Sequence, residues 1–380
     1  MPHPPGPYSS TLLEAEAPPM SPLSLDPIAF RTPSAARTYR WEHDGSVSET
    51  DGVEGAATVV SLSDEAWADM TGQIRTFINL QLSGELTIEP GHFDQLAQWD
   101  PQLRLLHADI PIYDPAAVDL SAFDLEQVFT LDDSDDDLRA FFTATGFLHV
   151  GGVFSDAEMA AANAEVDRLA AAAKPDDNQS WWVTDEQDNA VLCRLIYTTQ
   201  RSDVLAALQC DPRTERLGTL LDRQLRSPAD RMEGASVLIK VPGRTRGLAN
   251  IPWHQDCGMG GHAIICPSTA IGIQLNGSSP ETGHLRLVPG SHGQTLPYLW
   301  ERQLHGVPVL AVNTEPGDVV LHVTDLMHAS PEPTAGGGRR TMYVDFYPPA
   351  LWDRVGPGEA FNDVVRSRTQ EAAALRTPAP

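Results

Sequence analysis

Hydrophobic positions in the first half of the chain recur mostly at helical spacing. One such set follows Ser63: Ala66, Met70, Ile74, Phe77 and Ile78. A serine just before an apolar helical pattern can cap the helix by accepting a hydrogen bond from a backbone N–H. The pattern therefore predicts one helix that begins at Ser63 and runs to about Ile78.

Three more polar residues stand where helix caps are expected. They are Ser134, Ser155 and Asp211. Ser134 lies inside an acidic run, residues 132–137, which could also be taken for a metal site. Carboxylates at a helix N-terminus interact favourably with the helix dipole, and Ser134 with Asp137 has the spacing of a capping box. We therefore interpret the run as the start of a helix.

The spacing of hydrophobic residues changes from about residue 236 onward. Short apolar runs are separated there by Gly, Pro and Asn, at 236–241, 263–276, 284–288, 307–312, 318–323 and 341–346. Several short strands at such spacing are typical of a sandwich or barrel. Because helices come first and strands follow, the chain is predicted to be mainly β with supporting helices, around a double-stranded β-helix (jelly-roll) core.

These patterns suggest four parts. Residues 1–40 are rich in Pro and Ser, which predicts a flexible arm. Residues 41–130 form an N-terminal extension of unknown role, and residues 131–350 the jelly-roll domain. Residues 351–380 form a tail with one possible helix.

Composition and net charge exclude some classes of binding partner. The 380 residues carry a formal net charge of -26. Such an acidic chain is a poor match for nucleic acid or for an anionic membrane, both of which attract basic patches. There is no signal-peptide pattern and no apolar run long enough for a membrane span, so a cytoplasmic protein is expected. The abundance of arginine and alanine suggests a bacterial source, and the four cysteines are expected to be reduced thiols.

The candidate chemistry is centred on His254 and Asp256. In an extended segment these two side chains share one face, because strand residues alternate. His328 follows the predicted strand 318–323. Two histidines and one carboxylate form the facial triad that suits Fe(II) and leaves coordination positions open. From the residues alone, this metal site and two ordinary polar histidines remain equally good interpretations. A closed structural zinc site would need a fourth ligand.

Several segments together resemble the phytanoyl-CoA dioxygenase family of Fe(II)- and 2-oxoglutarate-dependent oxygenases. They are FFTATGFLHVGGVFSDAEMAAANAEVDRLAA, IKVPG, WHQD, TGHLRLVPGSH, and GDVVLHVTDLMHAS followed by RR. The resemblance covers about residues 137–348 and leaves the first 130 residues uncovered. It implies a cupin-like barrel, with His254, Asp256 and His328 as catalytic metal ligands and with Fe(II), 2-oxoglutarate and O2 as cofactor and co-substrates.

The resemblance also implies a place for the distal carboxylate of 2-oxoglutarate. Alternation along residues 339–346 separates Arg339, with its polar neighbours, from Arg340, with its apolar ones. The polar face suits a ligand-filled interior, and the family's arginine also falls on Arg339, so Arg340 is expected to be structural. Ser330, Lys240 and Gln255 match positions that contact the co-substrate.

Further positions are assigned to a substrate pocket. The family often has a tryptophan where this chain has Gly272. The absence of the indole would enlarge or reshape the cavity. Arg286 could fill that space, meet an acidic group of the substrate, or lie on the surface. His284, His305 and His322 are expected to be ordinary packed or exposed residues, and His292 to stabilise a turn. The predicted pocket comprises Gly272, Gln274, Arg286, Trp181, Trp182, Arg194, Tyr197, Cys257, Met259 and His262.

The expected function is hydroxylation of an unactivated C–H bond in a small-molecule metabolite, with release of succinate and CO2. Desaturation, epoxidation or rearrangement with the same cofactors is the alternative within this chemistry. Halogenation is disfavoured, because related halogenases lack the carboxylate that Asp256 supplies. A non-catalytic barrel that binds a small molecule is the alternative of another class. No nucleic-acid or membrane partner is expected, and the oligomeric state stays open.

Overall fold

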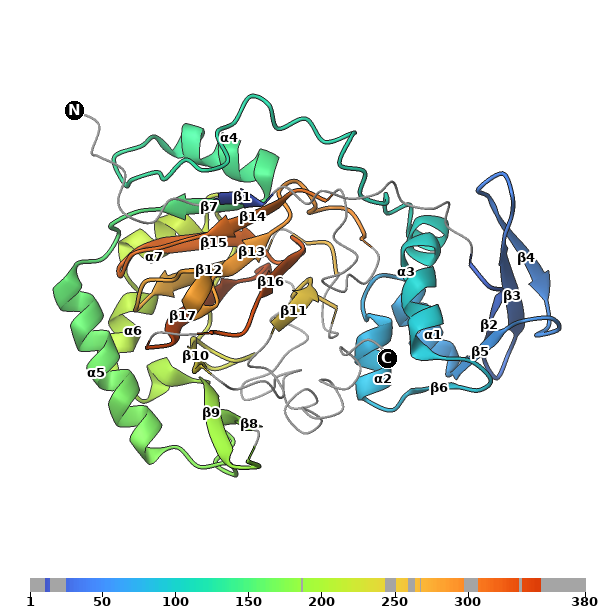
Figure 1. Cartoon of the computed structure of the whole chain (residues 1–380), viewed down its shortest axis with the longest axis horizontal. Helices are drawn as coiled ribbons and strands as arrows, with labels where there is room; N and C mark the ends of the chain where they lie inside the picture. The colour runs from blue at the N-terminus through green and yellow to red at the C-terminus, as the bar shows by residue number, and fades with distance from the viewer. Residues whose placement is uncertain are drawn as a thin grey trace.

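The computed structural model describes residues 11–13, 25–185, 187–242, 251–258, 264–266, 268–296, 307–334 and 337–349. Two facing sheets form the core (Figure 1). The larger has the order β7 (Phe147–Val150), β15 (Val319–Val323), β12 (Thr269–Gln274), β17 (Arg339–Phe346), β10 (Ser236–Lys240), β9 (Ala190–Leu195) and β8 (Ser180–Thr184). The smaller has the order β1 (Thr11–Leu13), β14 (Val309–Val312), β13 (Leu285–Leu287), β16 (His328–Ser330) and β11 (Ile251–His254). The predicted jelly-roll fold with supporting helices is confirmed.

Helices cover the outer face of the larger sheet. They are α4 (Asp135–Thr145), α5 (Asp156–Ala172), α6 (Asp203–Gln209) and α7 (Pro212–Gly218). Met342, Val344 and Phe346 of β17 belong to the same buried cluster as residues of these helices. Helix α7 approaches β17 so closely that a Cβ at Gly218 would lie 2.4 Å from the Phe346 ring. The apolar face of β17 is thereby committed to the helices, and its polar face is left for the space between the sheets.

The predicted caps at these helices are present. Ser134 accepts a hydrogen bond from the backbone N–H of Asp137 at the start of α4. Asp135, in the acidic run, pairs with Arg216 of α7 at 2.8 Å. The acidic run is therefore the N-terminus of a helix, as interpreted from the sequence.

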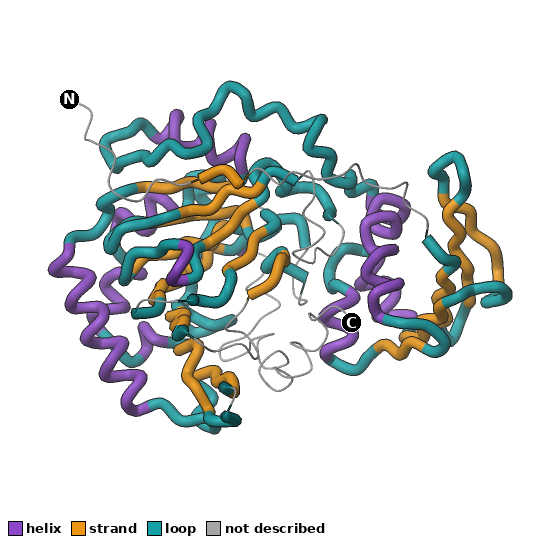
Figure 2. Tube along the Cα trace, viewed as in Figure 1, coloured by secondary structure: helices purple, strands orange, loops and turns teal. Residues whose placement is uncertain are grey.

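A second layer of structure stands beside the barrel, and we call residues 25–108 the N-terminal unit. Its sheet has the order β4 (Val47–Asp51), β3 (Ala36–Trp41), β2 (Ile28–Arg31), β5 (Thr58–Leu62) and β6 (Leu86–Ile88). Helices α1 (Asp64–Thr71), α2 (Phe77–Leu82) and α3 (Phe93–Ala108) lie between this sheet and the barrel (Figure 2). The unit has a hydrophobic cluster of its own, which includes Ile28, Tyr39 and Trp99.

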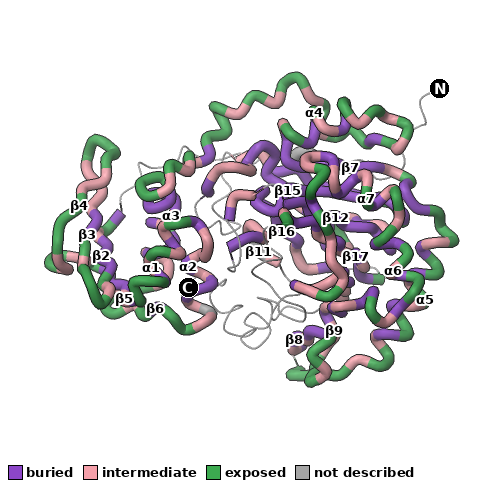
Figure 3. The backbone as a smooth tube through the Cα atoms, turned by 180° about the vertical axis from the view of Figure 1, so that it is seen from behind, coloured by how far each residue is buried: buried purple, intermediate pink, exposed green. Residues whose placement is uncertain are grey.

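Two predictions are wrong in this unit. The flexible arm expected at 1–40 does not hold for residues 25–40, because β2 and β3 are formed there. Most of β2 is buried (Figure 3), and Ile28 within it is fully buried. The single helix expected from Ser63 to Ile78 is two helices. Ser63 caps α1 as predicted, but the helix ends at Gly72, and Gln73 has a positive φ of 59°. A non-glycine residue in that region interrupts a right-handed helix.

Backbone hydrogen bonds join the N-terminal unit to the barrel. The N–H of Thr76 donates to the carbonyl of Gly258 at 2.8 Å, and the N–H of Ile264 donates to the carbonyl of Gln73 at 2.7 Å. The segment between α1 and α2 therefore lies against the chain that follows Asp256. The helix predicted in the tail 351–380 falls outside the described residues. Among the helices of the described ranges, none has the length and apolar character of a membrane span.

Candidate active site

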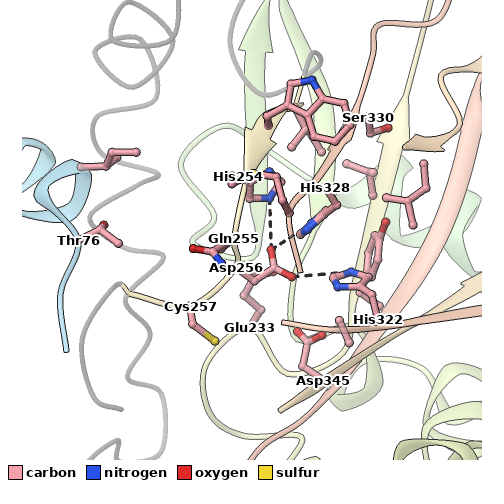
Figure 4. Close-up of a pocket in the computed structure, with 18 of the residues that line it drawn as sticks. Thr76, Glu233, His254, Gln255, Asp256, Cys257, His322, His328, Ser330 and Asp345 are labelled. Carbon is pink, nitrogen blue, oxygen red and sulfur yellow. Dashed lines mark ion pairs between the residues drawn. The ribbon is translucent and has the colours of Figure 1, made fainter. Parts of the chain in front are cut away.

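Three side chains converge at the open edge of the smaller sheet. His254 ends β11 and lies directly opposite His328 of β16 in the antiparallel register. Asp256 Oδ1 lies 3.3 Å from His254 Nε2 and 3.5 Å from His328 Nε2 (Figure 4). One ligand atom from each residue falls within 4.8 Å of the others. Adjacent ligands of an octahedral metal ion are about 3 Å apart at bond lengths of about 2.1 Å, so this donor set fits a metal.

The surroundings orient these ligands. The Nδ1 of His328 lies 2.9 Å from the carbonyl of Leu326, so an Nδ1–H donated there leaves Nε2 free to face the site. Burial lowers the pKa of His328, but the neighbouring Asp256 raises it more, and the net shift is upward. Burial raises the pKa of Asp256, and its histidine neighbours bring it well below the usual value. Without metal, Asp256 and His328 therefore stabilise each other's charge, and a metal ion would replace the histidine proton.

His322 is closer to the site than expected. It was predicted to be an ordinary packed or exposed residue, yet its Nε2 lies 3.9 Å from Asp256 Oδ2, and its ring centroid lies 4.3 Å from that of His328. Burial and the positive charge of His328 lower the pKa of His322 to about 3. His322 is therefore neutral at physiological pH and packs beside the carboxylate ligand.

Two buried cations of the larger sheet reach Ser330 of β16, two residues after His328. Arg339 and Lys240, paired across β17 and β10, are each 1% exposed. Arg339 donates to Ser330 Oγ, to the Gly283 carbonyl and to Tyr343 Oη at 3.0–3.2 Å. The alternation argument is confirmed, because Arg339 faces the interior and Arg340 does not.

Lys240 and Arg339 hold Ser330 between them. The Nζ of Lys240 donates to the Oγ and to the carbonyl of Ser330, both at 2.7 Å, and to the carbonyl of Pro331. Among the described residues, Lys240 and Arg339 donate hydrogen bonds only to neutral hydroxyl and carbonyl oxygens. Burial lowers the pKa of Lys240 well below its usual value, and Arg339 lowers it further. A carboxylate bound here would offset both effects.

Gln255 does not point toward this region. Its Oε1 accepts a hydrogen bond from Arg104 of the N-terminal unit at 3.2 Å, and its Nε2 donates to the carbonyls of Gln294 and Asp325. On an extended segment the residue between two metal ligands must face away from them. The structure therefore does not support the predicted contact between Gln255 and the co-substrate.

A cavity of about 240 Å³ opens beside the triad. Among the predicted pocket residues, Trp181, Arg194 and Cys257 line it, whereas the described residues Gly272, Gln274, Arg286, Trp182 and Tyr197 do not. Met259 and His262 lie outside the described residues. The sequence argument missed several lining residues, which share no motif: Thr76, Phe77, Ile78, Asp100, Arg104, Glu233, Ala270, His322 and Asp345.

Gly272 does not enlarge the cavity. A Cβ at this position would lie 3.1 Å from Thr341 Cγ2 and 3.4 Å from the Tyr343 ring. The Gln274 amide nitrogen donates to the Gly272 carbonyl at 3.0 Å and closes the same space. The volume that a tryptophan would take is therefore filled by neighbouring side chains of β17 and β12. Arg286, on β13 in the smaller sheet, is not needed to fill it.

The family model described as phytanoyl-CoA dioxygenase matches residues 142–341, which is more than half of the chain. The chain belongs to the phytanoyl-CoA dioxygenase family. It is therefore an enzyme of the Fe(II)- and 2-oxoglutarate-dependent oxygenases, and the structure contains a His-Asp-His site of the kind that can hold a metal ion. The N-terminal unit lies outside the matched residues. No curated protein matches the chain.

Solved structures with a similar barrel include AviO1 from Streptomyces viridochromogenes Tue57, at 23% identity and a TM-score of 0.47, covering 57% of this chain and 96% of that one. The carbocyclase SnoK from nogalamycin biosynthesis has 20% identity, coverage of 62% and 96%, and a TM-score of 0.48. EctD from S. alaskensis, with 2-oxoglutarate and 5-hydroxyectoine, has 20% identity, coverage of 71% and 93%, and a TM-score of 0.48. Likeness at this level says nothing about the substrate of this family member.

Proposed function

We propose that this protein hydroxylates an unactivated C–H bond of a small-molecule metabolite, with conversion of 2-oxoglutarate to succinate and CO2. The observation that carries the proposal is a cavity lined by the His254, Asp256 and His328 triad and by Ser330, whose hydroxyl is bonded by two buried cations, Lys240 and Arg339. When bound, iron together with 2-oxoglutarate and O2 supplies the oxidation. The chain's own residues bind the metal and 2-oxoglutarate, orient the substrate, and exclude water from the cavity.

The metal ligands in this proposal are His254, Asp256 and His328. Their ligand atoms lie within 4.8 Å of one another beside the cavity, and two histidines with one carboxylate would suit Fe(II) and leave it positions for its co-substrates. The Leu326 carbonyl holds the His328 ring in the orientation that presents Nε2. His322 remains neutral beside Asp256 and so adds no charge that would compete with a metal ion.

The co-substrate residues are Arg339, Ser330 and Lys240. A guanidinium can bind the distal carboxylate of 2-oxoglutarate with two parallel hydrogen bonds. Lys240 already donates to Ser330 and Pro331, so its role is to hold the Ser330 hydroxyl in place and to add positive charge beside Arg339. The two positive charges held next to Ser330 would thus favour a dicarboxylate although the chain as a whole is strongly acidic.

The substrate would occupy the cavity on the open side of the triad. Its walls combine apolar side chains, among them Trp181 and Leu238, with the Arg194–Glu233 ion pair and Asp345. Burial, with Asp256 and Glu233 nearby, raises the pKa of Asp345 well above its usual value, so this carboxyl can donate a hydrogen bond to a substrate oxygen. A space of about 240 Å³ suits a small molecule rather than a polymer. The cytoplasmic location expected from the sequence is part of the same proposal.

The test is succinate formation from 2-oxoglutarate with Fe(II), O2 and ascorbate, first without and then with a panel of bacterial metabolites. Stimulated turnover with a product heavier by one oxygen atom supports hydroxylation. A product lighter by two hydrogen atoms, an epoxide or a rearranged product would replace hydroxylation with another outcome of the same chemistry. A protein that binds Fe(II) and 2-oxoglutarate but never forms succinate would be a non-catalytic barrel, and the proposal would fail.

A further inference from the structure

The N-terminal unit is outside the family match, yet it forms part of the cavity wall. Its five lining residues are Thr76, Phe77, Ile78, Asp100 and Arg104. They come from the start of α2 and from one face of α3, where Asp100 and Arg104 are one helical turn apart. The side of the cavity next to Gln255 is therefore built by residues that the barrel does not supply.

Arg104 makes the connection between the two parts. Its Nε donates to Gln73 Oε1 at 2.7 Å, within the N-terminal unit. Its Nη1 donates to Gln255 Oε1 at 3.2 Å and to Thr295 Oγ1 at 3.0 Å, both in the barrel. The side chain is buried, with only 7% of the residue exposed. One guanidinium thus spans three segments that are far apart in the sequence.

The charge on Arg104 is only weakly compensated. The nearest carboxylate in the described part of the chain is that of Asp100, with 4.0 Å between Nη1 and Oδ2. The Nη2 atom is buried and has no hydrogen-bond partner among the described residues. A buried cation with an unused donor costs desolvation energy, so stability alone does not account for an arginine here. The forked shape of the guanidinium accounts for an arginine at this position, because a lysine could not reach Gln73, Gln255 and Thr295 together.

Gln255 transmits this contact to the metal ligands. It stands between His254 and Asp256, and its amide is held by Arg104 on one end and by the carbonyls of Gln294 and Asp325 on the other. Because the side chain is bonded at both ends, the backbone that carries the two ligands cannot rotate independently. Hydrogen-bond partners of this kind, one step away from a metal, tune its affinity in other metalloenzymes.

We infer that the N-terminal unit is part of the catalytic unit, and that Arg104 is a positioning residue that sets the spacing of His254 and Asp256 through Gln255. The inference rests on the proposed function, because it assumes that these two residues hold the metal. Arg104 does not touch the metal itself. Its effect is on the orientation of the ligands, so the signature is a change in metal affinity.

The experiment compares full-length variants by anaerobic titration with Fe(II), followed by calorimetry, and by thermal unfolding of the metal-free protein. Arg104→Met removes the bridge, and a loss of metal affinity of about 10-fold or more is expected. Arg104→Lys keeps the charge and should lose less. Leu96→Ala is the matched control, because Leu96 is fully buried on the same helix and belongs to the hydrophobic cluster of the N-terminal unit. It should lower the melting temperature and leave metal affinity unchanged.

Gln255→Leu removes the acceptor, and its effect should not add to that of Arg104→Met in the double variant. If Arg104→Met does not fold, Gln255→Leu decides the matter: weaker Fe(II) binding supports the inference, and wild-type affinity overturns it. Wild-type affinity in Arg104→Met would overturn the inference, as would an equal loss of affinity in Leu96→Ala. Failure of the unmodified protein to bind Fe(II) would instead contradict the proposed function, so the two failures are distinguishable.

Discussion

Arg339 and Arg340 are neighbours in the chain, and their guanidinium groups point to opposite sides of β17. Arg339 bonds Ser330 and Tyr343 inside the barrel. Arg340 reaches out to α5, where it donates to Asn163 at 3.1 Å and to Asp167 at 2.6 Å. The same substitution can therefore be made at both positions, with Arg339 as the test of co-substrate binding and Arg340 as its control.

We predict that Arg339→Met raises the KM for 2-oxoglutarate by about 10- to 100-fold, because charged hydrogen bonds contribute about 1.5–3 kcal/mol each and 1.4 kcal/mol is tenfold. Arg340→Met removes a hydrogen bond to Asn163 and an ion pair with a carboxylate that is 66% exposed, and should cost about 1 kcal/mol of stability without changing the KM for 2-oxoglutarate. Succinate assays at varied 2-oxoglutarate measure both. Equal effects on KM would contradict the assignment of Arg339.

His254→Ala and Asp256→Ala should each abolish Fe(II) binding and succinate formation. The two side chains are 27% and 35% exposed, so their removal leaves little unfilled volume and the far-ultraviolet circular dichroism should be unchanged. His292→Asn is the control, since His292 bonds the Thr143 carbonyl and does not line the cavity. Near-normal turnover in either ligand variant would rule out the triad.

Gly272→Ala should destabilise the protein by about 1–3 kcal/mol, because the new methyl group would press on Thr341 and Tyr343 in a packed region. Gly337→Ala is the control, since no atom lies within 4 Å of its Cβ position. Urea unfolding measures the difference. A Gly272→Ala protein as stable as the wild type would mean that the space beside this strand is open after all.

Asp100 should make stability depend on pH. Burial raises its pKa to about 6, partly offset by Arg104. A carboxyl whose folded-state pKa is raised stabilises the fold most below the unfolded value, and that contribution is lost as pH rises from about 4 to about 6. The loss is on the order of 3 kcal/mol. In urea unfolding across this range, Asp100→Asn should make the pH dependence of stability shallower, because Asp325, whose pKa is also raised to about 6, still contributes. Asp94→Asn, in the first turn of the same helix, should leave the dependence as in the wild type.

The barrel and the metal ligands could be predicted because their signals are local. Alternation places His254 and Asp256 on one face, and it assigns Arg339 and Arg340 to opposite faces of β17. The same alternation, applied to Gln255, places its side chain away from the two metal ligands, and the structure shows it bonded to Arg104, Gln294 and Asp325.

The remaining site residues depend on contacts between distant segments. His322 and Asp345 reach the cavity floor because β15 and β17 both pair with β12 in a register that places Ala270 between them. Such a register is set by the whole sheet. Arg104 has no motif around it, and its role appears only when α3 lies against the barrel. The break at Gly72 also escaped prediction, because the apolar spacing continues through it.

The bridge between Arg104 and Thr295 spans 191 positions of the chain. The N-terminal unit buries a cluster made only of its own residues, so it can fold during synthesis before the barrel strands exist. Gln255 and His328 emerge much later, and the closing of such long loops is the slow part of folding. In a chain still on the ribosome, the N-terminal unit can therefore be folded before the metal ligands have been synthesised. Iron can be captured only after synthesis has passed His328, which makes loading with metal a late event in the life of the molecule.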